Sequence, residues 1–332
     1  MTEARKILLQ ADDVSKWFPI KGWFFEPKRY VQAVNHVSFR LYQGETLGLV
    51  GESGCGKSMT ALSIMRLTQK NAKVTGSITL DGESLLDMPM KDFRKIRGNR
   101  VSMIFQEPMT SLNPVFTVGH QLMEVFRLHQ GLDKKQAREK SIEALRMVNV
   151  PMPEKRVDCY PYQLSGGLRQ RVMIAMALAC RPEVLIADEP TTALDVTIQA
   201  QVLDLMCKLR DELGTAIAFI THDLGVVSEL CTRTIVLYCG EIMEQGDTRS
   251  LLTEPLHPYT EGLKASLPER GSRDRLHVIP GSVPSALDFP KGCVFAPRCP
   301  YATQRCAAEK PPLYDMGGGR AVRCFRYEEV ES

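Results

Sequence analysis

The feature that most constrains the fold of this chain is the segment Gly51-Glu52-Ser53-Gly54-Cys55-Gly56-Lys57-Ser58, which fits the pattern GxxxxGK followed by Ser or Thr. It follows an apolar run at 46–50 and opens a helical pattern, which is the context that this motif requires. Glycines allow the backbone to curl so that its N–H groups point at an anion, and the N-terminus of the following helix adds partial positive charge. The segment therefore predicts a phosphate-binding loop, in which Lys57 reaches the β- and γ-phosphates of a nucleotide and the Ser58 hydroxyl ligates Mg²⁺.

Strand-like patterns alternate with helical ones along most of the chain, which argues for an α/β fold with a mainly parallel core sheet. The segment 106–165 interrupts this alternation with helical patterns, and we interpret it as a helical insertion. Proline and glycine become dense after residue 255, so regular structure is expected to be short there. We therefore predict a first domain at 1–255 and a small loop-rich domain at 256–332. The expected strands are 37–41, 46–50, 74–80, 100–105, 183–188 and 216–221.

Composition limits the classes of function that this chain can have. Its 42 basic and 39 acidic residues give a formal net charge of +3, which offers no electrostatic case for binding nucleic acid or an anionic membrane surface. No stretch reaches the roughly 18 apolar residues that a membrane-spanning helix needs. The first residues carry scattered charges and no hydrophobic block, so we expect no signal peptide and a location in the cytosol. A function at a membrane would therefore be that of a peripheral subunit.

An apolar run at 184–187 ends in two carboxylates, Asp188 and Glu189. Buried carboxylates are costly without a partner, and Mg²⁺ beside a phosphate would supply one. We expect Asp188 to hold the metal, usually through water, and Glu189 to polarise the attacking water as a general base. Taken alone, such a pair is more often a helix cap, but its combination with the phosphate-binding loop favours the functional interpretation.

The segment Leu164-Ser165-Gly166-Gly167-Leu168-Arg169-Gln170 closely resembles the signature sequence of ABC ATPases, with Leu168 where glutamine is most often found. Other marks of that family follow in the expected order along the chain. Gln106 resembles the Q-loop glutamine, Asp195 in Ala193-Leu194-Asp195 the D-loop aspartate, and His222 the switch histidine that contacts the γ-phosphate.

This resemblance implies an ABC-type nucleotide-binding domain with an antiparallel β subdomain beside the parallel core. It also implies a head-to-tail dimer in which Ser165, Gly166, Gly167 and Gln170 serve the ATP bound to a partner. Catalysis would fall to Glu189 and His222. An aromatic residue would stack on adenine; Phe18 matches the usual position, and Tyr30 is the alternative. The residues that the resemblance assigns to ATP are Phe18, Gly51, Glu52, Ser53, Gly54, Cys55, Gly56, Lys57, Ser58, Met59 and Gln106, and those assigned to Mg²⁺ are Ser58, Gln106 and Asp188.

Four further segments narrow the resemblance to the oligopeptide/dipeptide branch of bacterial import ATPases: 108–114, 257–260, 279–281 and 292–300. That branch implies a peripheral subunit at the cytoplasmic face of the inner membrane. Its partners would be a second ATPase subunit, identical or a sister, two transmembrane permease subunits and an extracytoplasmic substrate-binding protein. The residues after Gln106 would form the groove for a coupling helix of the pore. A nickel chelate or glutathione could replace peptide as cargo.

A different class of function is also open to the sequence, namely an ABC ATPase acting on nucleic acid or ribosomes. Proteins of that kind tend to have long coiled-coil insertions or two fused ATPase halves. This chain has one signature and one phosphate-binding loop, and its charges form no basic stripe. We therefore expect no nucleic-acid partner.

Four of the 10 cysteines, Cys293, Cys299, Cys306 and Cys324, lie close together near the end of the chain. In a reducing cytosol such a group indicates a metal site more than disulfides. Its spacing lacks the CxxC pairs of zinc ribbons, and four thiolates suit a [4Fe–4S] cluster. Some members of the oligopeptide/dipeptide branch are known to carry such a cluster, so the resemblance supports iron–sulfur, with Zn²⁺ as the alternative and plain buried thiols as the third interpretation.

Overall fold

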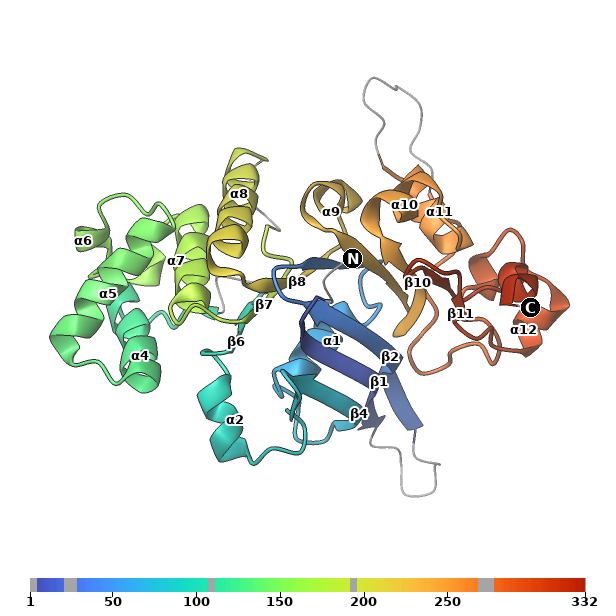
Figure 1. Cartoon of the computed structure of the whole chain (residues 1–332), viewed down its shortest axis with the longest axis horizontal. Helices are drawn as coiled ribbons and strands as arrows, with labels where there is room; N and C mark the ends of the chain where they lie inside the picture. Colours follow the sequence, from blue (N-terminus) through green and yellow to red (C-terminus); the bar gives the residue numbers. More distant parts are fainter. Residues whose placement is uncertain (1–4, 21–28, 107–110, 192–195, 268–277, 332) are drawn as a thin grey trace. The chain divides into compact units, whose positions relative to one another are not determined.

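Two compact units make up the chain. The first, here the helical unit, comprises Met1–Leu9, Leu41–Glu45 and Asp81–Phe219; the second, here the loop unit, comprises Gln10–Arg40, Thr46–Leu80 and Ile220–Ser332. The structure is a computed structural model, and Figure 1 traces it along the sequence. It describes residues 5–20, 29–106, 111–191, 196–267 and 278–331.

In the helical unit, the strand order is β8-β7-β6, with β6 at Val101–Ile104, β7 at Val184–Asp188 and β8 at Ala216–Thr221. β6 and β7 pair in parallel, from Val101 opposite Val184 to Ile104 opposite Ala187. Every residue of these strands is buried, as expected for a parallel sheet covered on both faces. The carboxyl ends of β6 and β7 therefore meet at one edge of the sheet.

Helices fill the rest of the helical unit, and local sequence signals set their ends. Thr117 caps α4 by accepting from the N–H of His120, and Gly131 ends that helix in the left-handed conformation with φ 66. Asp133 and Gln136 form a capping box at the start of α5. Figure 1 shows α4 to α7 grouped together; α4, α5 and α6 fall within the predicted insertion at 106–165, and α7 follows it. The helices are α2 (Met90–Ile96), α4 (Val118–Gln130), α5 (Lys134–Met147), α6 (Pro153–Arg156), α7 (Gly166–Leu178) and α8 (Val196–Leu213), with the 3₁₀ turn η1 at Pro161–Gln163.

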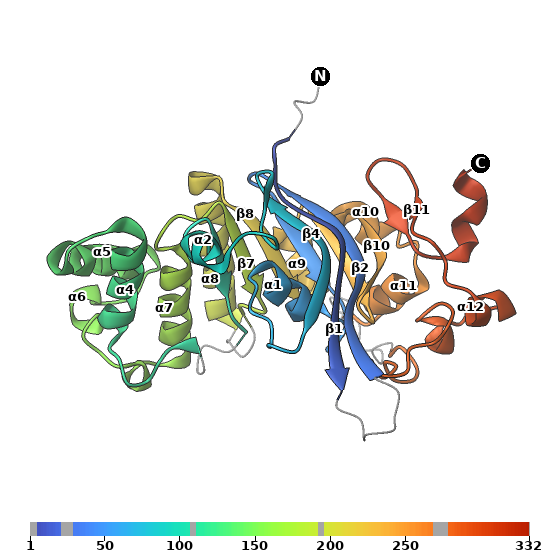
Figure 2. The same cartoon turned by 90° about the horizontal axis from the view of Figure 1, so that it is seen from below.

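The loop unit contains most of a second sheet, in which β1 (Ile7–Ile20) lies between β2 (Arg29–Tyr42) and β4 (Lys73–Leu80). Figure 2 shows these three long strands side by side. The short strand β5 (Glu83–Ser84) follows β4 along the chain. β1 and β2 expose many polar residues, so only part of each strand shows an apolar pattern in the sequence.

The other strands of the loop unit run in the order β11-β12-β10-β9-β3. β3 pairs with β9 in parallel, and β9 joins β10 through a tight hairpin whose two turn residues, Cys239 and Gly240, have φ values of 50 and 77. β12 adds to β10 and β11 adds to β12, both antiparallel, so the end of the chain extends this sheet. The strands are β3 (Thr46–Val50), β9 (Arg233–Tyr238), β10 (Glu241–Asp247), β11 (Tyr314–Asp315) and β12 (Ala321–Val322).

Short helices surround these strands, and the C-terminal region has little regular structure, as its proline and glycine content predicts. Among the described residues, no helix combines the length and apolar character that a membrane crossing requires. The helices of the loop unit are α1 (Lys57–Ile64), α9 (Leu224–Leu230), α10 (Thr248–Thr253), α11 (Pro258–Ala265) and α12 (Gln304–Ala308), with 3₁₀ turns η2 (Ala296–Arg298) and η3 (Phe325–Glu331).

Candidate functional site

The phosphate-binding loop connects β3 to α1, and its glycines are required by sterics. Gly51 has φ 150, and a Cβ there would lie 2.2 Å from the carbonyl oxygen of Leu237. Gly56, which caps α1, has φ 101, and a Cβ there would lie 2.4 Å from the carbonyl oxygen of Ala33. Larger residues would have to displace backbone at both positions, so the curl of the loop depends on glycine.

Lys57 occupies the centre of this loop. Its side chain is buried, and its Nζ donates hydrogen bonds to the carbonyl oxygens of Gly51 at 2.7 Å and Glu52 at 3.1 Å. These carbonyl oxygens hold the ammonium inside the loop. Because they carry no net charge, they do not neutralise its positive charge. A buried cation beside the backbone of a glycine-rich loop at a helix N-terminus fits the phosphates of a nucleotide. Burial raises the pKa of the neighbouring Cys55 thiol, which makes this cysteine an inert packing residue.

The two carboxylates lie in the helical unit, at the end of β7. Asp188 is buried, with 4% of its surface exposed. Because Ile104 lies opposite Ala187 in the parallel pair, Gln106 comes beside Glu189, and its Nε2 donates a hydrogen bond to Oε2 of Glu189 across 3.1 Å. A buried carboxylate and an amide oxygen are ligands that suit Mg²⁺.

The backbone of Glu189 is strained. Its φ is 45, a left-handed conformation that residues with a Cβ rarely adopt. Such strain persists only where the surrounding structure imposes it, and it concentrates at functional sites. Asp81, Asn149, Met152 and Arg181 of the helical unit also have a positive φ, so this feature is not specific to Glu189. The hydrogen bond from Gln106 is the feature that ties the Glu189 carboxylate to the neighbouring strand.

The predicted signature segment begins helix α7. Ser165 caps the helix by accepting from the N–H of Leu168 at 3.4 Å, and Ser165 and Gly166 are both exposed. Gln170 is buried instead, and its amide donates to the carbonyl oxygen of Pro190, the residue that follows Glu189. Ser165 and Gly166 are therefore exposed at this turn, whereas Gln170 connects α7 to the residues that follow β7.

Four further residues named in the sequence analysis have different outcomes. His222 is exposed directly after β8, and the next residue, Asp223, caps α9. Phe18 is half-buried on β1 and Tyr30 is 45% exposed on β2, and the geometry does not choose between them as the adenine-stacking residue. Asp195 lies outside the described residues.

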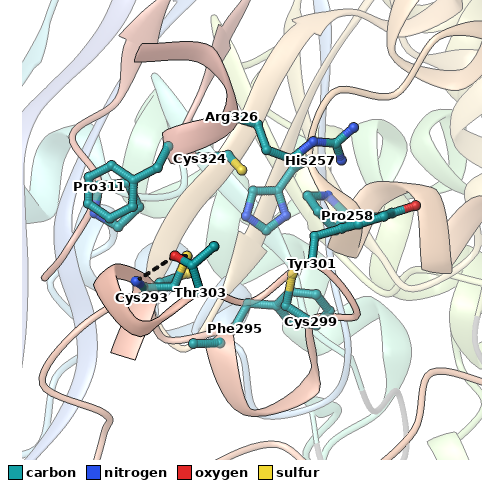
Figure 3. A pocket seen from close by; sticks show the side chains of 13 residues that line it. His257, Pro258, Cys293, Phe295, Cys299, Tyr301, Thr303, Pro311, Cys324 and Arg326 are labelled. Atoms are coloured by element: carbon teal, nitrogen blue, oxygen red, sulfur yellow. Dashed lines mark hydrogen bonds between the residues drawn. The ribbon is translucent and has the colours of Figure 1, made fainter. Parts of the chain in front are cut away.

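The four C-terminal cysteines line one cavity of about 220 Å³ in the loop unit, together with His257. Figure 3 shows the His257 ring between Cys324 and Cys299. Within the described parts of the chain, however, no group of three or more His, Cys, Asp or Glu residues is placed to hold a metal ion. The prediction of a [4Fe–4S] cluster at Cys293, Cys299, Cys306 and Cys324 is therefore wrong, and the Zn²⁺ alternative gains no support from these residues.

Burial affects the thiols of three of these cysteines. Burial raises the pKa of Cys293 to about 11 and also raises the pKa of Cys299 and Cys324. The Thr303 hydroxyl is hydrogen-bonded to the Cys306 sulfur at 3.3 Å. These raised pKa values favour neutral thiols in the metal-free chain. The four cysteines are close in sequence, so they could be expected to lie near one another. The sequence does not specify how their side chains are oriented.

Comparison with known proteins extends this picture to the whole chain. A family model described as ABC transporter matches residues 34–192, and one described as the oligopeptide/dipeptide transporter C-terminal region matches residues 243–306. The oligopeptide transport ATP-binding protein AppD of Bacillus subtilis (strain 168) is 54% identical over 313 residues, which cover 93% of this chain and 95% of AppD. The chain belongs to the ABC transporter ATPases of the oligopeptide/dipeptide branch. The predicted family and fold are thereby confirmed.

Other relatives of this ABC ATPase agree. The oligopeptide transport ATP-binding protein OppD of Salmonella typhimurium is 48% identical over 321 residues, covering 96% of this chain and 94% of OppD. A solved dimer of the ATP-binding cassette MJ0796, in a post-hydrolysis state bound to ADP and Pi, is 28% identical with a TM-score of 0.64. The match covers 73% of this chain and 99% of that structure.

Sequence reasoning about this ABC ATPase missed the residues that surround Glu52 in the phosphate-binding loop. Tyr259 and Arg298 both bind it, and both belong to segments that were noted only for their resemblance to the oligopeptide/dipeptide branch. A buried arginine and a buried tyrosine need hydrogen-bond partners. Both residues lie in a region rich in proline and glycine, where the sequence does not indicate which residues those partners are.

Proposed function

We propose that this ABC ATPase hydrolyses ATP to power the import of di- and oligopeptides across the cytoplasmic membrane. The observation that carries the catalytic part is the hydrogen bond from Gln106 to the carboxylate of Glu189, directly after β7. The peptide cargo is supported by the relatives, several of which are oligopeptide transport ATP-binding proteins.

The proposed roles follow from the chemistry of each side chain. Lys57 and the backbone N–H groups of the phosphate-binding loop bind the phosphates, and His222 contacts the γ-phosphate. Ser58, Gln106 and Asp188 hold Mg²⁺, which neutralises phosphate charge when it is bound.

Glu189 accepts the proton of the attacking water, so that the water oxygen can bond to the γ-phosphorus while the bond to the β-phosphate oxygen breaks. Gln106 keeps the carboxylate oriented for this transfer. The water proton passes to the carboxylate oxygen of Glu189, and ADP and phosphate are the products.

The proposed assembly contains a second ATPase subunit, identical or a sister, whose nucleotide faces Ser165, Gly166 and Gly167. The exposure of Ser165 and Gly166 supports this contact, as does the dimeric state of the MJ0796 cassette. Two permease subunits and an extracytoplasmic binding protein complete the importer, with this chain at the cytoplasmic face of the membrane. The domain division near residue 255 and the helical insertion at 106–165 stay predictions.

Reconstitution tests the proposal. The full chain would be purified with candidate permease and ATPase subunits from the same organism and placed in liposomes with a candidate binding protein. We expect ATP-dependent uptake of labelled di- or oligopeptides, abolished by Glu189→Gln. ATP hydrolysis that drives uptake of a nickel chelate or glutathione, but not of peptide, would overturn the cargo. Hydrolysis stimulated by ribosomes or nucleic acid and not by the permeases would overturn the transport function.

A further inference from the structure

Two side chains from the C-terminal region bind the second residue of the phosphate-binding loop. Arg298 donates through Nη1 to Oε2 of Glu52 at 2.6 Å and through Nη2 to Oε1 at 3.0 Å. Tyr259 accepts from the backbone N–H of Glu52 through its hydroxyl oxygen at 2.8 Å. All of these residues belong to the loop unit. The side chain and the backbone N–H of Glu52 are thus both engaged by residues more than 200 positions away, at sequence separations of 246 and 207.

Arg298 is itself rigidly placed. Only 4% of its side chain is exposed, and its Nε donates to the carbonyl oxygen of Pro280 at 3.0 Å. Nη2 also donates to the carbonyl oxygen of Ile279 at 3.2 Å, and Nη1 lies 3.3 Å from the hydroxyl of Tyr238. A planar guanidinium with this many partners presents a fixed fork to the Glu52 carboxylate.

Tyr259 is equally fixed by its surroundings. It is fully buried, and its ring packs against those of Tyr238 and Phe295 with centroid distances of 4.7 and 5.3 Å. The start of α11, which carries it, is anchored because the Glu244 carboxylate accepts from the N–H of His257 at 2.9 Å. The hydroxyl that meets Glu52 therefore sits on a packed aromatic cluster.

The loop atoms beside Glu52 are those that hold Lys57. The Lys57 ammonium donates to the carbonyl oxygens of Gly51 and Glu52, so the position of Glu52 helps to set the position of that ammonium. A free Glu52 could rotate its peptide groups and release Lys57 from its place. We propose that Arg298 and Tyr259 are positioning residues that hold the phosphate-binding loop in the form that accepts a nucleotide. This inference rests on the proposed function, in which Lys57 binds the phosphates.

The test measures MgATP affinity of the full chain by equilibrium binding, together with its melting temperature. Glu52→Gln and Arg298→Gln are each expected to weaken MgATP binding roughly 5- to 20-fold. The MgATP affinity of the double variant should equal that of the single variant with the lower affinity, because both changes remove the same ion pair. Arg305→Gln serves as the matched control, since it breaks the exposed pair of Arg305 with Glu328 in the same region and should leave affinity unchanged.

Several outcomes would overturn the inference. Variants with a lower melting temperature but wild-type MgATP affinity would show that the contacts only attach the C-terminal region. Equal weakening by Arg305→Gln, or full additivity in the double variant, would show that the effect does not pass through the Arg298–Glu52 pair. If Arg298→Gln fails to fold, Tyr259→Phe decides, because it keeps the ring and removes only the hydroxyl; wild-type affinity in that variant overturns the inference.

The same measurement separates this inference from the proposed function. A wild-type chain that binds MgATP no better than Lys57→Ala would contradict the proposed function itself. Wild-type binding that is lost in Lys57→Ala but unaffected in Tyr259→Phe and Arg298→Gln would contradict only the positioning role.

Discussion

The amide of Gln106 donates a hydrogen bond to the carboxylate of Glu189, with 3.1 Å between Nε2 and Oε2. The two residues lie 83 positions apart, and they meet because β6 and β7 pair in parallel with Ile104 opposite Ala187. The resemblance to the oligopeptide/dipeptide branch predicts that the residues after Gln106 receive the coupling helix of the pore. A movement of Gln106 would act directly on the carboxylate that we propose as the general base.

Replacing Glu189 by glutamine should leave MgATP binding intact and slow hydrolysis roughly 10²- to 10⁴-fold, the range of general-base catalysis. Glutamine keeps the size of the side chain and its capacity to accept from Gln106, but it cannot take a proton from water. Single-turnover hydrolysis in the assembled transporter is the measurement. Turnover near the wild-type rate would remove Glu189 from its proposed role.

Replacing Gln106 by alanine removes the hydrogen bond that orients Glu189. We expect kcat to fall roughly 10- to 100-fold, since small misplacements of a catalytic group have effects of that size. Stimulation of hydrolysis by the permease subunits should fall as well. Gln304→Ala, at an exposed glutamine of α12, is the matched control and should not change either quantity.

Replacing Lys57 by alanine removes the buried ammonium from the phosphate-binding loop. Hydrogen bonds to charged groups contribute about 1.5–3 kcal/mol, so MgATP affinity should fall by about 10-fold or more. Equilibrium binding of a fluorescent ATP analogue to the full chain measures this. The control is Lys208→Ala, because Lys208 is exposed and pairs with Asp204 on its own helix. Equal loss in both variants would contradict a specific role for Lys57.

Stability should fall on the acid side because of His257. Burial lowers the pKa of this histidine to about 3, and its Nδ1 accepts from the N–H of Tyr259 at 3.0 Å. An unfolded histidine titrates near about 6.5, so below that pH the unfolded chain binds a proton that the folded chain does not. Stability from this group is therefore present above about 6.5 and is lost as the pH falls toward 3.

Between pH 7 and pH 5, His257 alone should lower the free energy of unfolding by about 2 kcal/mol. Denaturant unfolding at the two pH values measures the change. His257→Asn keeps a capping acceptor but cannot titrate, so its pH dependence should be flatter by that amount. An unchanged pH dependence in this variant would show that other groups cause the acid sensitivity.

The sequence predicted some strands better than others, for physical reasons. β3 at Thr46–Val50 and β8 at Ala216–Thr221 have the predicted bounds, because strands buried on both faces are continuous apolar runs. β2 begins at Arg29, eight residues before the predicted start at 37. His36 has φ 49 and interrupts the alternation of exposed and buried side chains, so the apolar pattern becomes regular only after it.

Some features of the candidate site could also be predicted from the sequence, and others could not. The phosphate-binding loop could be predicted because its glycines and lysine act over eight consecutive residues. The strain at Glu189 and its bond from Gln106 could not, because both depend on how two strands pair. For the four cysteines, closeness in sequence led to the prediction of a metal site. In the described part of the chain, their side chains are not arranged to form one.

By itself, the sequence determined the phosphate-binding loop, the buried parallel strands and membership of the oligopeptide/dipeptide branch. Each of these depends on local chemistry: positive φ at glycine, continuous apolar runs and short motifs in a definite order. Only the tertiary structure decided that Arg298 and Tyr259 meet Glu52 and that the cysteines surround a cavity as separate thiols. Hydrogen bonds of that kind require two distant segments to be packed first, and no local pattern of residues specifies their geometry.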